Sequence, residues 1–409
     1  MTFGARLAAP FRKPLAGLIA ASLLIAPQSA LAKFAVAGFE LVHNAPAETT
    51  LVTPDLRDAA TVWCDMIGHA RHEIVLEQYY VTGKKGSALD RVIAALDAAG
   101  RRGVRIRFLM EAKGIANSDQ ETIARLKAIP HLEFRTLAWS DVNGSGIIHA
   151  KFIVVDGRDA YVGSQNFDWR SLEQIDETGL RISRPTIVQQ LGRLFEQDWR
   201  AQAIIAGGGR IPPLRTSAGA APAGDALLVA SPNAYDPNGV ADSQAALVRL
   251  IGAARRDIRI EVMQYSTTAF GGGSYTIIDE ALRAAARRGV HIRLMVADWA
   301  MTAARLPGLV SLATLPNVKI RVARIPQLAS GPIPYARVVH TKTMTVDGEI
   351  AWIGTSNWEG GYLDTSRNVE LVLRSRPIAT RLAAMQDQAW TSHYAVGLTE
   401  AQRLIPPAK

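Results

Sequence analysis

The stretch Ala98-Ala-Gly-Arg-Arg-Gly-Val-Arg-Ile-Arg107 decides the fold, because it returns almost unchanged as Ala284-Ala-Ala-Arg-Arg-Gly-Val-His-Ile-Arg293. Each copy starts with a helical composition, passes a glycine (Gly103 or Gly289) and continues with a strand composition. A glycine just after the last helical turn commonly ends a helix, so each copy predicts a helix followed by a strand. A repeat of this kind indicates two copies of one structural unit.

The repeat extends in both directions from this stretch. Upstream, Ala70-Arg-His-Glu-Ile74 returns as Ala254-Arg-Arg-Asp-Ile258, and each segment leads into a predicted strand, at 74–81 and 258–265. The alternation of strand and helix in both copies predicts an α/β fold.

The predicted architecture is two similar lobes, each a sheet flanked by helices. A helix around Trp199 in the first copy matches a helix around Trp390 in the second. Two such lobes can pack about a pseudo-twofold axis and bring equivalent residues into one shared active site. We expect a signal peptide at 1–32, the first lobe at 33–205, a Gly/Pro/Ala-rich linker at 206–224 and the second lobe at 225–409.

The first 32 residues are typical of a secretory signal peptide. A positively charged start contains Arg6, Arg12 and Lys13, an apolar run covers 15–26, and Ala30-Leu-Ala32 resembles a cleavage site. We expect cleavage after Ala32 and a periplasmic or secreted protein. An uncleaved anchor or a core helix is the alternative. The apolar run is too short to span a bilayer, and no later segment approaches the required length.

The composition excludes some classes of protein but does not identify a partner. The 409 residues are 48% hydrophobic and 20% charged, which excludes disordered, collagen-like and coiled-coil chains. Lys+Arg (46) exceed Asp+Glu (37) by 9, and loss of the three leader cations leaves 9 − 3 = +6. This excess fits an anionic partner without specifying one. Cys64 is the single cysteine, so an intramolecular disulfide is excluded and a buried, inert thiol is expected.

Each lobe contains the pattern His-x-Lys-x-x-x-x-Asp. The two copies comprise His149, Lys151 and Asp156, and His340, Lys342 and Asp347. Residues i and i+2 share one face of a strand, so each predicted strand presents an imidazole beside an ammonium group. Because the pattern occurs twice, at equivalent places in a repeat, two unrelated surface residues are a poor explanation for it.

A hairpin is predicted after each motif, with its turn at an Asp-Gly pair. The returning strand ends in a Gly-hydroxyl-x-Asn sequence, which supplies Ser164, Asn166, Thr355 and Asn357. The hairpin brings these side chains back to the His-Lys end, where they complete a predicted pocket for one phosphate. Asp156 and Asp347 complete the motifs, and we favour a turn-stabilising role for both over a chemical one.

These groups suffice for phosphodiester chemistry. One imidazole can attack phosphorus and form a phosphohistidine, while the other donates a proton to the leaving alcohol and later accepts one from water. The lysines balance the charge of the phosphoryl oxygens, so we expect neither a metal nor a cofactor.

Each histidine also needs a hydrogen-bond acceptor for its other nitrogen. Glu177, 28 residues after His149, is one candidate, and Glu370, 30 residues after His340, is another. Asn368 lies at the spacing equivalent to that of Glu177.

On these residues the chain resembles the phospholipase D superfamily, whose members carry two such motifs. The segments Gly163-Ser-Gln-Asn-Phe-Asp-Trp-Arg-Ser-Leu172 and Gly354-Thr-Ser-Asn-Trp-Glu-Gly-Gly-Tyr362 look most like a subgroup that holds animal lysosomal phospholipase-D-like exonucleases and poxvirus envelope phospholipases. The resemblance implies two α/β lobes around one site, with His149 as nucleophile and His340 as acid. The two-residue shift of Glu370 leaves the partner of His340 open.

The resemblance implies a phosphodiester substrate and leaves its class open. We place first a phospholipase D that hydrolyses phospholipid head-group phosphodiesters, with transphosphatidylation as a variant and transient contact with a membrane surface. The alternative is a nuclease or 5′ exonuclease acting on single-stranded nucleic acid. An inactive anion-binding protein is a remote third interpretation, and the two intact motifs argue against it. We expect a monomer, and we expect Trp139 and Tyr335 to be core or rim aromatics rather than stacking platforms.

Overall fold

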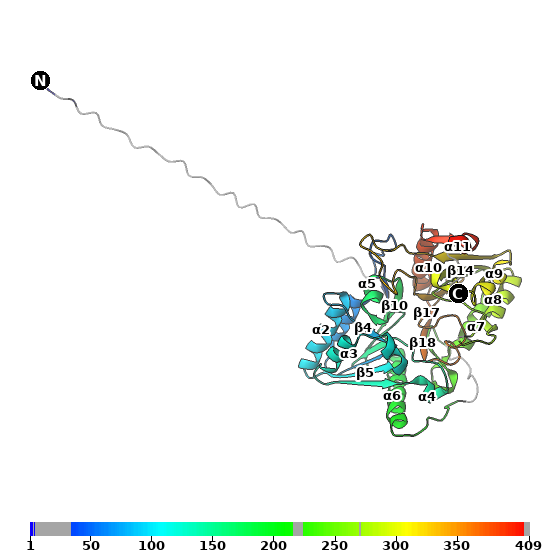
Figure 1. The fold of residues 1–409 in the computed structure, drawn as a ribbon, viewed down its shortest axis with the longest axis horizontal. Helices are drawn as coiled ribbons and strands as arrows, with labels where there is room; N and C mark the ends of the chain where they lie inside the picture. The colour runs from blue at the N-terminus through cyan, green and yellow to red at the C-terminus, as the bar shows by residue number, and fades with distance from the viewer. Residues whose placement is uncertain (3, 5–33, 216–223, 270, 405–409) are drawn as a thin grey trace. The chain divides into compact units, whose positions relative to one another are not determined.

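Two large sheets, one from each half of the chain, form the framework of the fold (Figure 1). The computed structural model describes residues 1–2, 4, 34–215, 224–269 and 271–404. The predicted signal peptide and its cleavage site fall outside these residues, apart from three positions near the start. Lys33–Lys409 is a single compact unit that holds both sheets.

The sheet of the first lobe is mixed. β3, β5 and β6 run parallel to one another, whereas β7, β8 and β10 alternate in direction. Its strands, in spatial order, are β1 (Ala35–Val36), β2 (Phe39–Asn44), β10 (Glu177–Ile182), β8 (Asp159–Gly163), β7 (Phe152–Val155), β3 (Glu73–Gln78), β5 (Arg105–Glu111) and β6 (Leu132–Leu137). A short parallel pair, β4 (Val81–Thr82) and β9 (Phe167–Asp168), lies outside this sheet.

The sheet of the second lobe repeats this order. Its strands are β12 (Ala241–Asp242), β11 (Ala226–Ser231), β18 (Asn368–Arg374), β17 (Ile350–Gly354), β16 (Lys342–Val346), β13 (Asp257–Val262), β14 (His291–Ala297), β15 (Val318–Ala323) and β19 (Ala395–Gly397). From β11 to β15 the order and directions match those from β2 to β6 in the first lobe. The predicted α/β fold of two similar lobes is therefore confirmed.

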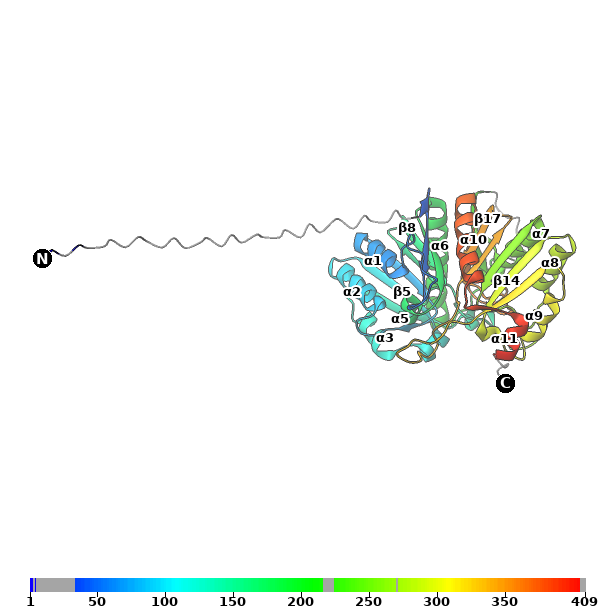
Figure 2. The ribbon, with the colours of Figure 1, turned by 90° about the horizontal axis from the view of Figure 1, so that it is seen from above.

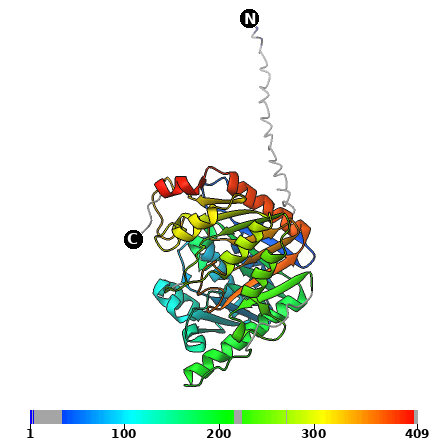
Figure 3. The ribbon, with the colours of Figure 1, turned by 90° about the vertical axis from the view of Figure 1, so that its right-hand side faces the viewer.

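Helices cover both faces of each sheet (Figures 2 and 3). The first half of the chain contains α1 (Ala59–His69), α2 (Ala88–Arg101), η1 (Ala112–Asn117), α3 (Gln120–Lys127), α4 (Trp139–Asn143), α5 (Trp169–Glu173) and α6 (Pro185–Ala206). The second half contains η2 (Asn233–Tyr235), α7 (Ser243–Ala253), α8 (Ile277–Arg287), η3 (Asp298–Ala300), α9 (Leu306–Ala313), α10 (Arg376–Thr391) and α11 (Leu398–Leu404). Among the described residues, every helix is too short or too polar to cross a membrane.

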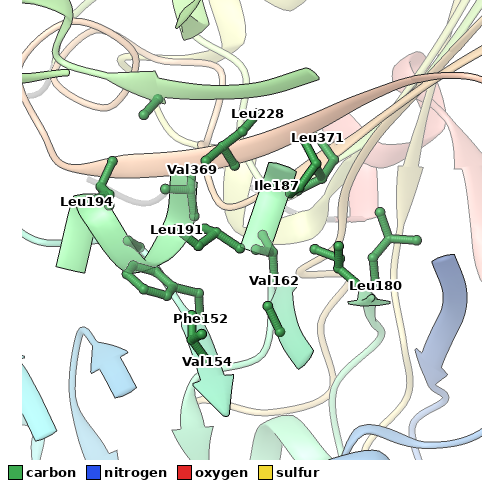
Figure 4. Close-up of a cluster of buried hydrophobic side chains, with 14 of the residues drawn as sticks. Phe152, Val154, Val162, Leu180, Ile187, Leu191, Leu194, Leu228, Val369 and Leu371 are labelled. Carbon is green, nitrogen blue, oxygen red and sulfur yellow. The ribbon is translucent and has the colours of Figure 1, made fainter. Parts of the chain in front are cut away.

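The long helices α6 and α10 lie between the two sheets, whereas α1, α2, α7 and α8 lie on the outer faces (Figure 2). α6 contacts strands of its own sheet and also β11 of the other lobe. Its apolar side chains Ile187, Leu191 and Leu194 pack between Phe152 and Val162 of the first sheet and strands β11 and β18 of the second (Figure 4). Burial of this shared core holds the lobes together, because it removes the inner apolar faces of both from water.

The local predictions from the repeat agree with the structure, except that both predicted strands are too long. α2 and α8 end two residues before Gly103 and Gly289, which adopt φ values of +87° and +92°. Glycine adopts this left-handed conformation without steric cost, which explains its place after both helices. The predicted strands at 74–81 and 258–265 end earlier, at Gln78 and Val262. After the first of them, Tyr79 and Tyr80 line a cavity instead. In the predicted linker, α6 ends at Ala206 and β11 begins at Ala226.

Candidate active site

Both motifs lie at the start of a hairpin strand. Lys151 directly precedes β7, and Lys342 is the first residue of β16. The following turns contain Asp156 (φ +51°) with Gly157 (φ +62°), and an equivalent pair in the second lobe. Two successive left-handed residues form the tight turn that suits the twist of a hairpin. The turns return β8 and β17 toward the motifs, as predicted.

Each motif is joined to the opposite lobe through its backbone. The N–H of His149 donates a hydrogen bond to the carbonyl of Arg367 (2.8 Å), and the N–H of His340 donates one to the carbonyl of Asp176 (2.9 Å). Arg367 and Asp176 occupy equivalent places, immediately before β18 and β10. The first residue of each of these strands therefore lies beside the histidine of the other lobe.

The side-chain acceptors of the histidines follow this crossing. His149 Nδ1 lies 3.1 Å from Asn368 Oδ1, and His340 Nδ1 lies 2.8 Å from Glu177 Oε2. Glu177 also accepts a hydrogen bond from Ser171 Oγ (2.9 Å). The pairing that the spacing suggested, with Glu177 on His149, is corrected, because the acceptor comes from the opposite lobe. Each acceptor holds a proton on Nδ1 and so leaves Nε2 for a substrate.

Glu370 is not a partner of His340. It lies two residues after Asn368 on β18, where its carboxyl group accepts hydrogen bonds from the hydroxyls of Ser243 and Ser356. Gly354 makes room for it, since a Cβ at Gly354 would lie 2.0 Å from Glu370 Cγ. Burial raises the pKa of Glu370 to about 7. The two-residue shift in spacing thus places this carboxyl group in a separate buried cluster.

Both motif aspartates bind backbone N–H groups, which supports the structural role favoured for them over a chemical one. Both oxygens of Asp156 accept backbone N–H groups of residues 71–73 at 2.8 Å. Asp347 does the same for residues 255–257, at 2.7–3.0 Å. These hydrogen bonds lower the pKa of both carboxyl groups despite their partial burial. Each aspartate fixes the connection from an outer helix to the central strand of its own sheet.

Burial shapes the ionisation of the lysines. Lys151 and Lys342 are almost fully buried, and each Nζ donates a hydrogen bond to the carbonyl of its own motif histidine. Desolvation lowers the pKa of Lys342 to about 7, and it also lowers the pKa of Lys151 well below its usual range. An anionic phosphodiester would raise both pKa values, because an opposite charge favours the protonated ammonium.

The two histidines differ in the charge of their partners. Desolvation lowers the pKa of His149 well below its usual range, and the nearby lysines add to this effect. The pKa of His340 is lowered to about 4 by burial, although the Glu177 carboxylate acts in the opposite direction. Burial would raise the pKa of Glu177, but His340 and Lys342 outweigh it and the net shift is downward. The site thus pairs a neutral imidazole held by an amide with one held by a carboxylate.

A cavity of about 560 Å³ opens onto both histidines. His149, His340, Asn166 and Asn357 line it together, so the structure brings these predicted residues to one place. The two predicted hydroxyl residues, Ser164 and Thr355, do not line the cavity. Ser164 Oγ hydrogen-bonds to the backbone of Thr178, and Thr355 Oγ1 donates to Asn368 Oδ1 (2.8 Å). These two residues support the acceptors rather than lining the cavity.

Aromatic side chains that the sequence analysis did not select surround His149. The imidazole centroid lies 5.6 Å from the ring of Tyr79 and 4.9 Å from the ring of Tyr362. Tyr80, Trp299 and Tyr335 also line the cavity. The two tyrosines that directly follow β3 could have indicated this aromatic lining from the sequence. Their composition is typical of a strand, however, and it favoured a longer strand instead.

The two aromatics upstream of the motifs have different environments. Trp139 is fully buried and donates from Nε1 to the carbonyl of Thr365 (2.9 Å). Tyr335 is 74% exposed at the cavity. Trp139 is thus a core residue, and Tyr335 is a rim residue.

A family model described as "Cardiolipin synthase, PLD-like domain" matches residues 63–199 and 247–390. The chain belongs to the phospholipase D superfamily. One matched segment lies within each half of the chain, and each includes one complete His-Lys motif. The chain is accordingly a phospholipase D-like phosphodiesterase.

Curated relatives carry two kinds of name. A probable phospholipase D of Caenorhabditis elegans is 30% identical over 83% of this chain and 67% of that protein. The 5′-3′ exonuclease PLD4 of Mus musculus is 30% identical over 88% of this chain and 79% of that protein. Similarity thus extends to the exonuclease subgroup as well as to proteins named as phospholipases.

A solved structure shares the fold. The phosphatidylserine synthase of Haemophilus influenzae superposes with a TM-score of 0.59 at 11% identity, over 84% of this chain and 89% of that one. At this identity the likeness concerns the fold alone.

The position of Asp156 predicts a loss of stability without a loss of chemistry. Asp156→Ala leaves the N–H groups of residues 71–73 without their acceptor, so we expect the free energy of unfolding to fall by about 1–3 kcal/mol. Urea denaturation and steady-state assays check this, and kcat of the folded variant should stay within about twofold of the wild type. Asp347→Ala is the matched variant of the second lobe. A large fall in kcat at unchanged stability would restore a catalytic role.

The crossed acceptors predict opposite shifts in the pH profile. Glu177→Gln removes the carboxylate that favours protonated His340, so kcat should fall about 100-fold and the alkaline limb should move to lower pH. Asn368→Asp adds a carboxylate beside His149, which raises its pKa and should move the acid limb to higher pH. Profiles of kcat/KM for both variants measure these limbs. Movement of the same limb in the same direction by both would contradict separate partners.

Glu370 predicts a pH-dependent cost to stability. Its pKa is raised from 4.5 to about 7 in the fold, so it is ionised more readily in the unfolded chain. The wild type should therefore lose stability as the pH rises from about 4.5 to above 7, by about 3 kcal/mol. Glu370→Gln should lack this component, and urea denaturation of both proteins at pH 5 and pH 9 measures it. Parallel pH dependences of the two proteins would show that Glu370 does not carry it.

Proposed function

We propose that the protein hydrolyses phosphodiesters through a phosphohistidine on His149, with His340 as general acid and then general base. The asymmetry of the acceptors supports this division. Asn368 keeps His149 oriented without adding charge, which suits a neutral nucleophile. Glu177 stabilises the protonated form of His340, which suits a proton donor.

The two steps balance without a further reactant except water. In the first, His149 Nε2 forms a bond to phosphorus as the bond to the leaving oxygen breaks, and His340 Nε2 donates its proton to that oxygen. In the second, water attacks phosphorus, His340 accepts the proton and the phosphorus–nitrogen bond breaks. Lys151 and Lys342 contribute positive charge beside the phosphoryl oxygens, where negative charge develops.

The lining of the cavity favours single-stranded nucleic acid as the substrate. Five aromatic rings line it, together with the amides of Asn117, Asn166 and Asn357. These rings belong to Tyr79, Tyr80, Trp299, Tyr335 and Tyr362. Aromatic faces bind bases of any sequence by stacking, and amides hydrogen-bond to base edges and sugars. This lining carries the proposal, and the similarity to a 5′-3′ exonuclease accords with it.

A phospholipid, which the sequence analysis placed first, is the second candidate. Three apolar side chains are exposed around the cavity or next to it: Ile115 (40%), Trp299 (37%) and Tyr335 (74%). Side chains of this kind could contact a membrane surface transiently while a head group enters the cavity. The similarity to proteins named phospholipase D accords with this alternative.

Export is part of the proposal and rests on the sequence of the first 32 residues. We propose that cleavage after Ala32 releases a monomeric protein to the periplasm or the exterior. Mass spectrometry of the secreted chain would reveal a start at Lys33, and light scattering would report its mass.

The division of roles predicts different kinetics for two variants. With the p-nitrophenyl ester of thymidine 3′-phosphate, the leaving group needs no proton, so His340→Ala should still release one equivalent of nitrophenol in a burst. Its hydrolysis step should be slowed by about 100-fold or more, which traps acid-labile, alkali-stable phosphate on His149. His149→Ala should give no burst. A burst from His149→Ala alone would reverse the roles.

The substrate class is tested separately. Wild-type protein should release nucleotides from single-stranded DNA with a free 5′ hydroxyl, and His69→Ala, which changes a histidine with an 81% exposed side chain, serves as the control. Vesicles of phosphatidylcholine or phosphatidylglycerol form the second arm. Release of choline or glycerol with inert DNA would establish the phospholipid alternative.

A further inference from the structure

The segment that connects β15 to β16 extends from the second lobe onto the first. It reaches the first lobe at Arg337, whose backbone N–H donates to the carbonyl of Gln174 (3.0 Å). The guanidinium of Arg337 donates to the carbonyls of Ala47 (2.6 Å) and Pro326 (2.7 Å). Because Arg337 is buried by these contacts, the connection is fastened at this point.

Tyr335, two residues earlier, is held at the cavity in an uncommon conformation. Its φ is +58° and that of Arg337 is +60°, although neither is glycine. Such conformations are strained for residues other than glycine, so the bonds of Arg337 must hold the backbone in place. The result is a ring that lines the cavity yet remains 74% exposed.

Arg170 supports this position from the first lobe. Its guanidinium donates to the carbonyl of Pro334 (3.1 Å) and lies 5.8 Å from the centre of the Tyr335 ring. Asp168, which is fully buried, binds the same guanidinium at 2.8 Å and accepts from Tyr80 Oη at 2.7 Å. A continuous set of contacts therefore links Tyr80 inside the cavity to Tyr335 at its rim.

The position of Tyr335 in the cavity indicates which part of the substrate it contacts. Tyr79 and Tyr362 flank His149, whereas Tyr335 lies at the rim of the cavity on the segment that leads into His340, five residues before it. In an in-line displacement the leaving group lies opposite the nucleophile and next to the proton donor. The departing part of the substrate therefore faces away from the aromatic pair around His149, toward His340 and the open rim.

We propose that Tyr335, backed by Arg170, is the subsite for the departing strand, whose first base stacks on the exposed ring. This assignment rests on the proposed function and adds a residue that determines affinity for long substrates. The closed aromatic pair around His149 then holds the part of the substrate that stays on the phosphohistidine.

Substrates that differ only in the leaving group test the assignment. In the methyl esters of thymidine 3′- and 5′-monophosphate the leaving group is methanol, which offers no ring to stack on. With full-length protein, Tyr335→Ala should lower kcat/KM about tenfold less for the methyl ester that the wild type cleaves than for a single strand. For a ten-nucleotide single strand its KM should rise about tenfold, the size expected for one lost stacking contact, at nearly constant kcat.

Two further substitutions separate ring stacking from apolar contact. Tyr335→Phe keeps the ring and should match the wild type, whereas Tyr335→Leu keeps an apolar side chain and should behave as Tyr335→Ala does. Val310→Ala, which changes an exposed apolar residue on α9 that does not line the cavity, is the control. Thermal denaturation verifies that every variant folds.

Three outcomes would overturn the assignment. An unchanged KM of Tyr335→Ala for the ten-nucleotide strand would show that the departing strand does not contact the ring. Wild-type behaviour of Tyr335→Leu would show that stacking is not the interaction. A wild-type protein that cleaves a methyl ester but no oligonucleotide would overturn the proposed substrate together with the subsite, which distinguishes that failure from the other two.

Discussion

The hydrogen bonds that cross between the lobes are the constraint on which the site depends. Each motif histidine donates its backbone N–H to a residue of the other lobe, and the next residue in that lobe accepts from the imidazole. The shared core around α6 holds the lobes close enough for these bonds to form. The orientation of the imidazoles therefore depends on the packing between the sheets, because a small displacement of the lobes would misplace both histidines.

Burial of the reacting groups is the second determinant. Two lysines and two histidines lie together with little solvent access, and desolvation lowers the pKa of each. Such a cluster resists full protonation while the cavity is empty, since like charges repel and the medium is poorly polarising. A bound phosphodiester supplies the missing negative charge. Binding of substrate thus changes the number of protons that the lysines and histidines of the site hold.

The sequence predicted the architecture of this protein better than it predicted the side-chain contacts between the lobes. The repeat predicted two α/β lobes, and the motif spacing predicted hairpins that return Asn166 and Asn357 to the histidines. Spacing within a lobe could not reveal that Glu177 serves His340, because that contact depends on how the lobes pack. Nor could it select Tyr79 or Arg170, whose roles arise only where distant segments enclose a cavity.

The crossed arrangement also bears on how such a protein can change through inheritance. Each half supplies an imidazole that it does not itself orient, and an orienting group whose imidazole belongs to the other half. Recombination that replaced one half with that of a relative would preserve both contacts only if the new half supplied an acceptor and an imidazole that match the half that remained. After duplication, a change in one histidine of the pair would therefore have required a matching change of its acceptor in the other half.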